Sequence, residues 1–136
     1  MTTLDLDRLL SDEPDASFHD SELLSLALDW IERSAHLRFR IPVSYREGRY
    51  PTYRLGTLHI TGLVFLSMEP PRNIDTTQPM WIAADGPLPD PNIKVELPVP
   101  PGIPDTAFLH YIFNTSTNSF LYFAGQDAVF LWDIAS

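Results

Sequence analysis

The residues best suited to chemistry form one cluster near the N-terminus, Ser17-Phe18-His19-Asp20-Ser21-Glu22. Histidine and carboxylate side chains act as metal ligands and as acid–base groups. In an extended chain Asp20 and Glu22 share one face while His19 points to the other, so they converge only if the backbone turns. The cluster is therefore open to three interpretations: a turn that begins a strand, a ligand or partner contact, or a catalytic group.

The remaining histidines, His36, His59 and His110, give weaker evidence for a functional site. A histidine within a strand pattern is more often a core or surface group than a ligand. The sequence contains no HExxH and no other short histidine spacing typical of zinc, so a metal site would have to combine distant residues such as His19, Asp20 and His110. Glycine-rich phosphate loops and a GxSxG nucleophile elbow are also absent. We therefore assign no catalytic residue and predict no cofactor.

Acidic and aromatic residues beside rigid segments are the candidates for binding a partner. Glu69 precedes Pro70-Pro71-Arg72, where an ion pair between Glu69 and Arg72 is the alternative interpretation. Aromatic side chains on rigid loops are common at interfaces, although Trp81 can equally pack its loop onto a sheet. The candidate partner-binding residues are Asp20, Glu22, Glu69, Trp81 and Asp85.

Two runs of alternating apolar residues, 24–30 and 37–43, follow the cluster. They are separated by the short polar connection 32–35. This pattern is typical of a β-hairpin, although the composition of 20–33 also favours a helix. Trp30 ends the first run and is predicted to lie in the core.

Further strand patterns follow. Residues 53–68 predict a third strand, with Gly56 and Gly62 as bulge or bend points and an end at 63–66 that is apolar on both faces. Residues 108–113, 120–123 and 128–132 predict three more strands separated by turns. Trp132, at the end of the last strand, is also expected in the core.

Ten of the thirteen prolines lie in residues 70–104. Proline lacks a backbone donor, which excludes a central strand or a long helix there. Apolar or alternating residues at 80–84 and 93–97 predict one or two short edge strands within an ordered excursion.

A short helix is expected near the N-terminus, capped by Thr2 or Thr3 and ended by Pro14. The strands are joined by short turns, without the βαβ spacing of a parallel sheet. Together these elements predict the α+β class, mainly antiparallel β, with two hairpin regions and a proline-rich excursion in a single domain, 1–136.

Composition bounds the function further. The chain has 136 residues, eighteen acidic and nine basic, with a net charge of −9 and no cysteine. This charge argues against nucleic-acid binding, and the lack of cysteine excludes a disulfide scaffold. Residues 1–22 are acidic and 33–54 arginine-rich. These segments can complement each other within the fold or face partners, although a charge run of this kind is most often simply solvated. The start does not resemble a signal peptide and no stretch predicts a membrane helix, so we expect a cytoplasmic protein.

The segment Phe18-His19-Asp20-Ser21-Glu22-Leu23-Leu24 resembles the start of small uncharacterised bacterial proteins in which FHD[AS]-E-[LV] leads into a β-hairpin. It is similar in this respect to a predicted immunity-protein family of polymorphic toxin systems. The resemblance covers about residues 17–41. It implies a small cytoplasmic α+β protein of bacterial type that neutralises a toxin by binding it, and it implies no catalytic residue.

Three functions stay open. The first is a non-enzymatic protein-binding protein with a basic partner such as a nuclease toxin, because opposite charges accelerate association. The second is a self-associating structural β protein that pairs through edge strands as a homo-oligomer. The third is a metal-dependent or acid–base enzyme built on the His19 and Asp20 cluster. The first fits the sequence best.

Overall fold

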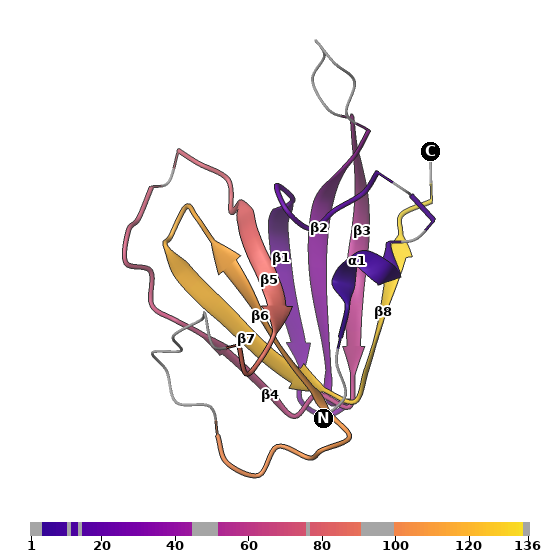
Figure 1. Ribbon diagram of the computed structural model, residues 1–136, viewed down its shortest axis with the longest axis vertical. Coiled ribbons are helices and arrows are strands. Elements are labelled where there is room, and N and C mark those ends of the chain that lie inside the picture. The colour runs from indigo at the N-terminus through magenta and orange to yellow at the C-terminus, as the bar shows by residue number, and fades with distance from the viewer. Residues whose placement is uncertain are drawn as a thin grey trace.

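The computed structural model describes residues 4–10, 12–13, 15–44, 52–75, 77–90 and 100–134 (Figure 1). They form two four-stranded antiparallel sheets, with strand orders β1-β2-β3-β8 and β4-β7-β6-β5, and one short helix. This confirms the predicted class, α+β and mainly antiparallel β. The elements are α1 (Leu6–Leu9), β1 (Glu22–Asp29), β2 (Ser34–Ser44), β3 (Thr52–Thr61), β4 (Phe65–Met68), β5 (Ile82–Pro87), β6 (Phe108–Asn114), β7 (Ser119–Gly125) and β8 (Asp127–Trp132).

The predicted hairpin of β1 and β2 is present, with Leu26 opposite Leu37 and a bulge between residues 23 and 25. Only its β2 side is deeply buried, because β1 is the edge strand of its sheet. The prediction that Trp30 lies in the core is wrong. This side chain is 51% exposed, since it follows the end of the edge strand and lies in the turn.

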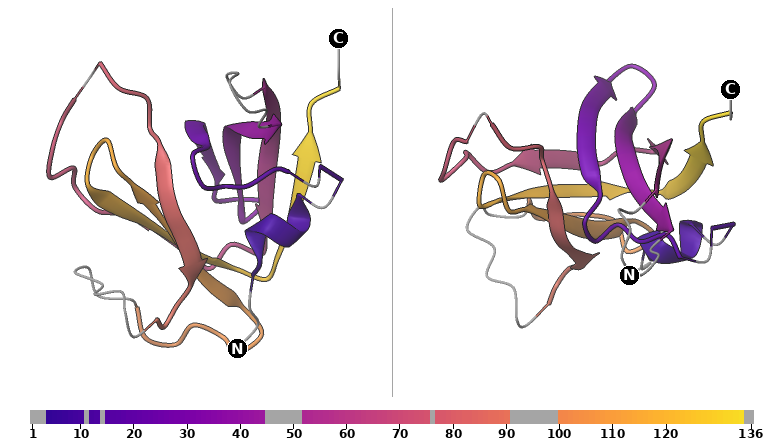
Figure 2. Two further views of the ribbon diagram at one scale, coloured as in Figure 1. Left: turned by 45° about the horizontal axis from the view of Figure 1, so that its top comes forward. Right: turned by 90° about the horizontal axis from the view of Figure 1, so that it is seen from above.

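Residues 53–68 form two strands rather than one. β3 ends at Thr61, Gly62 turns the chain with a φ of +60°, and β4 continues in the other sheet. The connection from β7 to β8 passes from the second sheet to the first at the same place. There the Gln126 N–H donates to the carbonyl oxygen of Thr61 at 3.0 Å. β3 therefore pairs with β8, and β4 pairs with β7. Figure 2 shows β7 continuing into β8, so that one bent two-stranded ribbon serves both sheets.

Gly62 is thus a bend, as predicted, whereas Gly56 is not a bulge. The register of β2 with β3 runs unbroken past Gly56. The expectation that residues 63–66 are buried on both faces is also wrong beyond Leu63, because β4 is a half-buried edge strand.

The two sheets also meet where β1 begins, in a contact that we call the β1–β5 seam. Glu22 forms an antiparallel bridge with Trp81. The Asp20 N–H donates to the Ile82 carbonyl oxygen at 2.8 Å, and the Ile82 N–H donates to the Ser21 carbonyl oxygen at 2.9 Å. The seam joins the N-terminal motif to the proline-rich segment.

The main core lies between the sheets. Leu37 and Phe39 from one sheet meet Ile112 and Phe123 from the other, and all four are fully buried. Leu4, Leu6 and Leu10 of the N-terminal segment are buried in this core, and the partly buried Leu9 packs against it.

The predicted short helix is present and has four residues. Its cap is Asp5, whose carboxylate accepts the Arg8 N–H. The predicted caps Thr2 and Thr3, and Pro14, lie outside the described residues. Such a short helix is held by docking its leucines, because one turn has little stability of its own.

A second apolar cluster covers the other face of the β4-β7-β6-β5 sheet. Leu109, Tyr111 and Tyr122 pack there with Leu88, and Ile103 packs against them. Leu88 and Ile103 belong to the proline-rich segment, which therefore covers this sheet. The same segment supplies one edge strand, β5, as predicted, while the second expected strand at 93–97 lies outside the described residues.

Candidate binding site

The motif at residues 18–22 forms a turn rather than an extended segment. The Ser21 N–H and Oγ both donate to the Phe18 carbonyl oxygen, at 3.1 and 2.7 Å, and Asp20 adopts a φ of +67°. Phe18 is fully buried, with its ring 5.1 Å from that of Phe39. Most of the motif therefore closes the core and the seam.

The turn brings His19 and Asp20 together at the surface. Their Nδ1 and carboxylate atoms are 3.2 Å apart, and both side chains are exposed. Glu22 instead accepts a hydrogen bond from Arg40 at 3.0 Å. The candidate metal ligand His110 pairs with Asp85 on other strands. Across the part of the chain that the structure describes, no group of three or more histidine and acidic side chains is arranged to hold a metal ion.

Glu69 is buried, unlike the other candidate partner-binding residues. Its side chain is 3% exposed, with one carboxylate oxygen accepting the Phe120 N–H at 2.9 Å and the other 3.6 Å from Arg72. The predicted local ion pair is therefore present, and Glu69 faces inward. Trp81 is half-buried at the seam beside Asp20 and Glu22.

Of the alternatives for the acidic and arginine-rich segments, the structure shows that they complement each other at two places. Glu13 pairs with Arg54, and Glu22 pairs with Arg40. Both arginine side chains remain partly exposed, so these are ion pairs of the surface that neutralise two of the arginines.

Asp85 and His110 form a deeply placed ionisable pair, with side chains that are 19% and 1% exposed. They come from the adjacent strands β5 and β6, and His110 Nε2 lies 2.8 Å from the Asp85 carboxylate. The histidine is 1% exposed. Its place between Phe108 and Ile112 in the strand alternation was the signal for a core position, but its partner could not be identified from the sequence.

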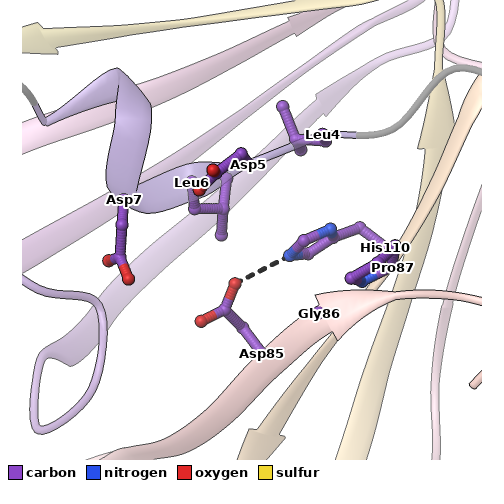
Figure 3. Close-up of a pocket in the computed structure, with 8 residues that line it drawn as sticks. All are labelled: Leu4, Asp5, Leu6, Asp7, Asp85, Gly86, Pro87 and His110. Carbon is purple, nitrogen blue, oxygen red and sulfur yellow. Dashed lines mark hydrogen bonds and ion pairs between the residues drawn. The ribbon is translucent and has the colours of Figure 1, made fainter.

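A cavity of about 250 Å³ opens beside this pair, beneath α1 (Figure 3). In Figure 3 the carboxylates of Asp7 and Asp85 face the space below Leu6. Asp7 also accepts the Phe18 N–H at 3.2 Å through one oxygen. The described lining residues are Leu4, Asp5, Leu6, Asp7, Asp85, Gly86, Pro87 and His110. They combine apolar walls with three carboxylates and include no serine, threonine or cysteine that could act as a nucleophile beside the histidine.

The negative charge at this end of β5 also affects a neighbouring phenol. Burial raises the pKa of Tyr111, and the charges of Asp90 and Asp85 raise it further.

Exposed apolar side chains gather at the turn between β1 and β2. Ile31 is 93% exposed beside Trp30 and the partly exposed Leu28, and we call these three residues the tip patch. The Asp29 carboxylate accepts the N–H groups of Ile31 and Glu32, both at 3.0 Å, which holds the turn in one conformation. The alternation of apolar residues in 24–30 predicted which side chains share one face of β1. It could not predict that the opposing sheet does not cover Leu28 and Trp30 on that face.

No protein-family model, curated protein or solved structure matches this chain. Within the described residues, no helix is long and apolar enough to span a membrane. Fold and surface chemistry are therefore the basis for assigning a function.

An ion pair on the outer face of the first sheet leads to a pH prediction. Arg38 donates to both carboxylate oxygens of Asp133 and thereby lowers the pKa of that carboxyl from 3.8. The Asp133 carboxyl therefore binds a proton more readily in the unfolded chain than in the folded one. The ion pair stabilises the fold fully when the pH is above the ordinary aspartate pKa, and this stabilisation is lost as the pH falls through the lower pKa of the folded state. We expect Asp133→Asn to reduce this acid-dependent loss in urea unfolding between about pH 5 and pH 2. The exposed Asp105→Asn is the control, and identical pH profiles for both variants would contradict the assignment.

Proposed function

We propose that the chain is a non-enzymatic protein-binding protein with a basic partner, of the toxin-neutralising kind that the resemblance at residues 18–24 implies. The observation that supports this most directly is the tip patch. A tryptophan and an isoleucine stand exposed on a turn that is fixed by its own hydrogen bonds.

Apolar burial would supply the affinity of such a contact. Tryptophan is enriched among the residues that dominate binding energy at interfaces. A turn already held by Asp29 loses little conformational entropy on binding, which leaves more of the burial free energy for the complex. The Leu63 N–H also donates to the Arg33 carbonyl oxygen at 2.8 Å, which ties the turn to the start of the other sheet.

Charge supports a basic partner. The net charge of −9 speeds association with a positively charged protein. Asp29 and Glu32 flank the tip patch, and the exposed Arg33 follows them, so two acids and one arginine border the contact on the side of this chain. An apolar pocket surrounded by lysine or arginine is the complementary surface.

The β1–β5 seam is the other surface to test, because it combines the exposed Asp20 with the half-buried Trp81. It lies at the opposite end of β1 from the tip patch, and the eight residues of that strand span about 25 Å. Single substitutions therefore distinguish the two surfaces.

The test is affinity capture from the source organism's lysate at low and moderate salt, with partners identified by mass spectrometry. We expect one basic partner in stoichiometric amount, weaker binding at moderate salt, and at least about tenfold less capture by Ile31→Asp or Trp30→Ala. Leu131→Asp, an equally apolar exposed site on β8, is the matched control.

The other outcomes separate the alternatives. Loss of capture with Asp20→Lys alone would transfer the contact to the seam. If neither Ile31→Asp nor Trp30→Ala changes the amount of partner captured, the tip patch is not the binding surface. A dimer in light scattering that Ile31→Asp dissociates would show that the patch binds a second copy, and the self-associating function would replace the proposed one.

A further inference from the structure

The outer edge of β1 is paired along only its first part. Residues 80–82 lie against residues 20–23 there, and the Leu23 N–H donates to the Met80 carbonyl oxygen at 3.0 Å. Beyond Leu23, no strand in the described part of the chain pairs with β1 on that side. Residues 25–29 therefore form the free part of this edge, and all of them except the half-buried Leu26 are exposed.

Strand alternation and the bulge in β1 decide which backbone groups point outward. Successive residues of a strand direct their N–H and C=O groups to opposite sides. Ser21 and Leu23 direct theirs at residues 80–82, where Ser21 accepts and Leu23 donates. The bulge that follows adds one residue, so the next outward residues are Leu26 and Leu28. Their backbones offer two donors and two acceptors to another extended chain.

The opposite side of the sheet gives the same assignment. The Asp133 N–H donates to the Leu55 carbonyl oxygen at 2.9 Å, so the odd-numbered residues of β3 face β8. The registers of β2 with β3 and of β1 with β2 carry this alternation across the sheet, so Ala27 faces β2. Leu26 and Leu28, one residue to either side, therefore face outward.

The edge strands β4, β5 and β8 are less open than β1. β4 has only four residues, and β5 ends in Pro87, which has no N–H. In β8 the Ala128 N–H is bonded to the Asp127 carboxylate at 2.9 Å. β1 has neither a proline nor a charge in residues 24–28. A free edge without such protection is a template for another strand.

The side chains beside the free edge specify the strand that fits it. Residues directly opposite each other in an antiparallel pair lie on the same face of the sheet. On one face Leu26 packs against the main core, and Leu28 follows it with 40% exposure. On the other face lie Ala27 and Asp29, both exposed. A complementary strand therefore alternates apolar residues beside the leucines with basic residues near Asp29.

We propose that the free edge of β1 binds an extended segment of the basic partner by antiparallel strand addition, with backbone hydrogen bonds to Leu26 and Leu28. The added strand continues the line of residues 80–82 and reaches the tip patch. This inference rests on the proposed function, because it names the part of the partner that binds and its chemistry.

The test is amide hydrogen exchange of the ¹⁵N-labelled chain, with and without the peptide acetyl-(Lys-Val)₃-amide. In the free chain we expect the Leu26 and Leu28 amides to exchange faster than the Ala27 amide, which bonds to β2. Millimolar peptide is expected to slow exchange at Leu26 and Leu28 by at least about tenfold, because strand addition gives both N–H groups an acceptor.

N-methylated peptides are the matched controls. Methyl groups on the valine nitrogens remove the donors directed at β1, and we expect this peptide to give no protection. Methyl groups on the lysine nitrogens point away from β1, and we expect this peptide to protect as the parent does.

Acidic peptides and a charge variant test the chemistry of the segment. The analogue acetyl-(Glu-Val)₃-amide is expected to bind more weakly, because it brings negative charge near Asp29. Asp29→Asn keeps an acceptor oxygen for the turn and is expected to reduce the preference for the lysine peptide by about twofold to fivefold. The exposed Asp12→Asn, which lies outside this edge, is expected to leave the preference unchanged.

Unchanged exchange at Leu26 and Leu28 in millimolar peptide, or equal protection by the two N-methylated peptides, would overturn the proposal. Protection that rises with the concentration of the chain itself, together with a dimer in light scattering, would show that a second copy occupies the edge and would overturn it as well.

Failure of this inference is distinguishable from failure of the proposed function. If capture from the lysate depends on the tip patch but no peptide protects the edge, the partner binds without strand addition, and only this inference fails. If the lysine peptide protects the edge but no basic partner is captured, the proposed function fails and strand addition at β1 stands.

Discussion

Replacement of Phe18 by alanine is expected to lower the free energy of unfolding by about 3–5 kcal/mol. Phe18 is fully buried, and its ring makes edge-to-face contacts with Phe39 and Phe130 at centroid distances of 5.1 and 5.7 Å. Removal of this ring leaves a cavity in the main core, next to the turn at residues 18–21 from which β1 begins. Urea unfolding of the wild type and the variant measures the loss.

Two variants of the same turn make this prediction specific. Phe18→Leu retains most of the buried volume and is expected to cost less than the alanine variant. His19→Ala alters the next side chain, which is exposed, and is expected to change stability within about 0.5 kcal/mol. A Phe18→Ala variant no less stable than His19→Ala would show that the motif does not anchor the core.

Gly56→Ala is expected to lower the free energy of unfolding by about 1–3 kcal/mol. A Cβ atom at this position would lie 2.4 Å from a ring carbon of Phe130 and 3.1 Å from the Leu131 carbonyl oxygen. The ring cannot retreat freely, because it packs against Phe18 and lies 4.8 Å from the Trp132 ring. This close approach, rather than a bulge, is the reason for glycine in the middle of β3.

A double-mutant cycle identifies the clash as the cause. Phe130→Leu removes the ring atoms nearest the added Cβ, so Gly56→Ala is expected to cost less in that background than in the wild type. Both effects are read from urea unfolding. Additive costs would mean that the carbonyl oxygen of Leu131, and not the ring, limits the space.

The position of the motif residues changes the meaning of the resemblance at residues 18–24. Phe18 and Ser21 are buried and hold the turn, and Glu22 is paired with Arg40. The exposed part of the motif is His19 with Asp20. A motif of this kind in two proteins therefore indicates that both begin a β-strand in the same way. It is weaker evidence that both bind a partner through the same surface.

Local patterns in the sequence were sufficient for most of the secondary structure. Alternation of apolar side chains predicted the hairpin of β1 and β2 and the strands β6, β7 and β8, because each pattern reflects neighbours a few residues apart. The concentration of prolines likewise placed β5 at a sheet edge, since proline cannot donate to a central ladder. The interpretation of Glu69 and Arg72 as a local ion pair depended only on residues three apart.

The sequence alone thus determined the fold class, the positions of most strands and the acidic charge, all of which depend on composition or short-range order. Only the tertiary structure decided that the chain changes sheets at Gly62 and Gln126, that Trp30 stands outside the core, and that Asp85 meets His110 beneath α1. The physical reason is the same in each case. Strand periodicity specifies the face on which a side chain lies, but the partner strand and the reach of the opposing sheet depend on contacts between residues distant in the chain.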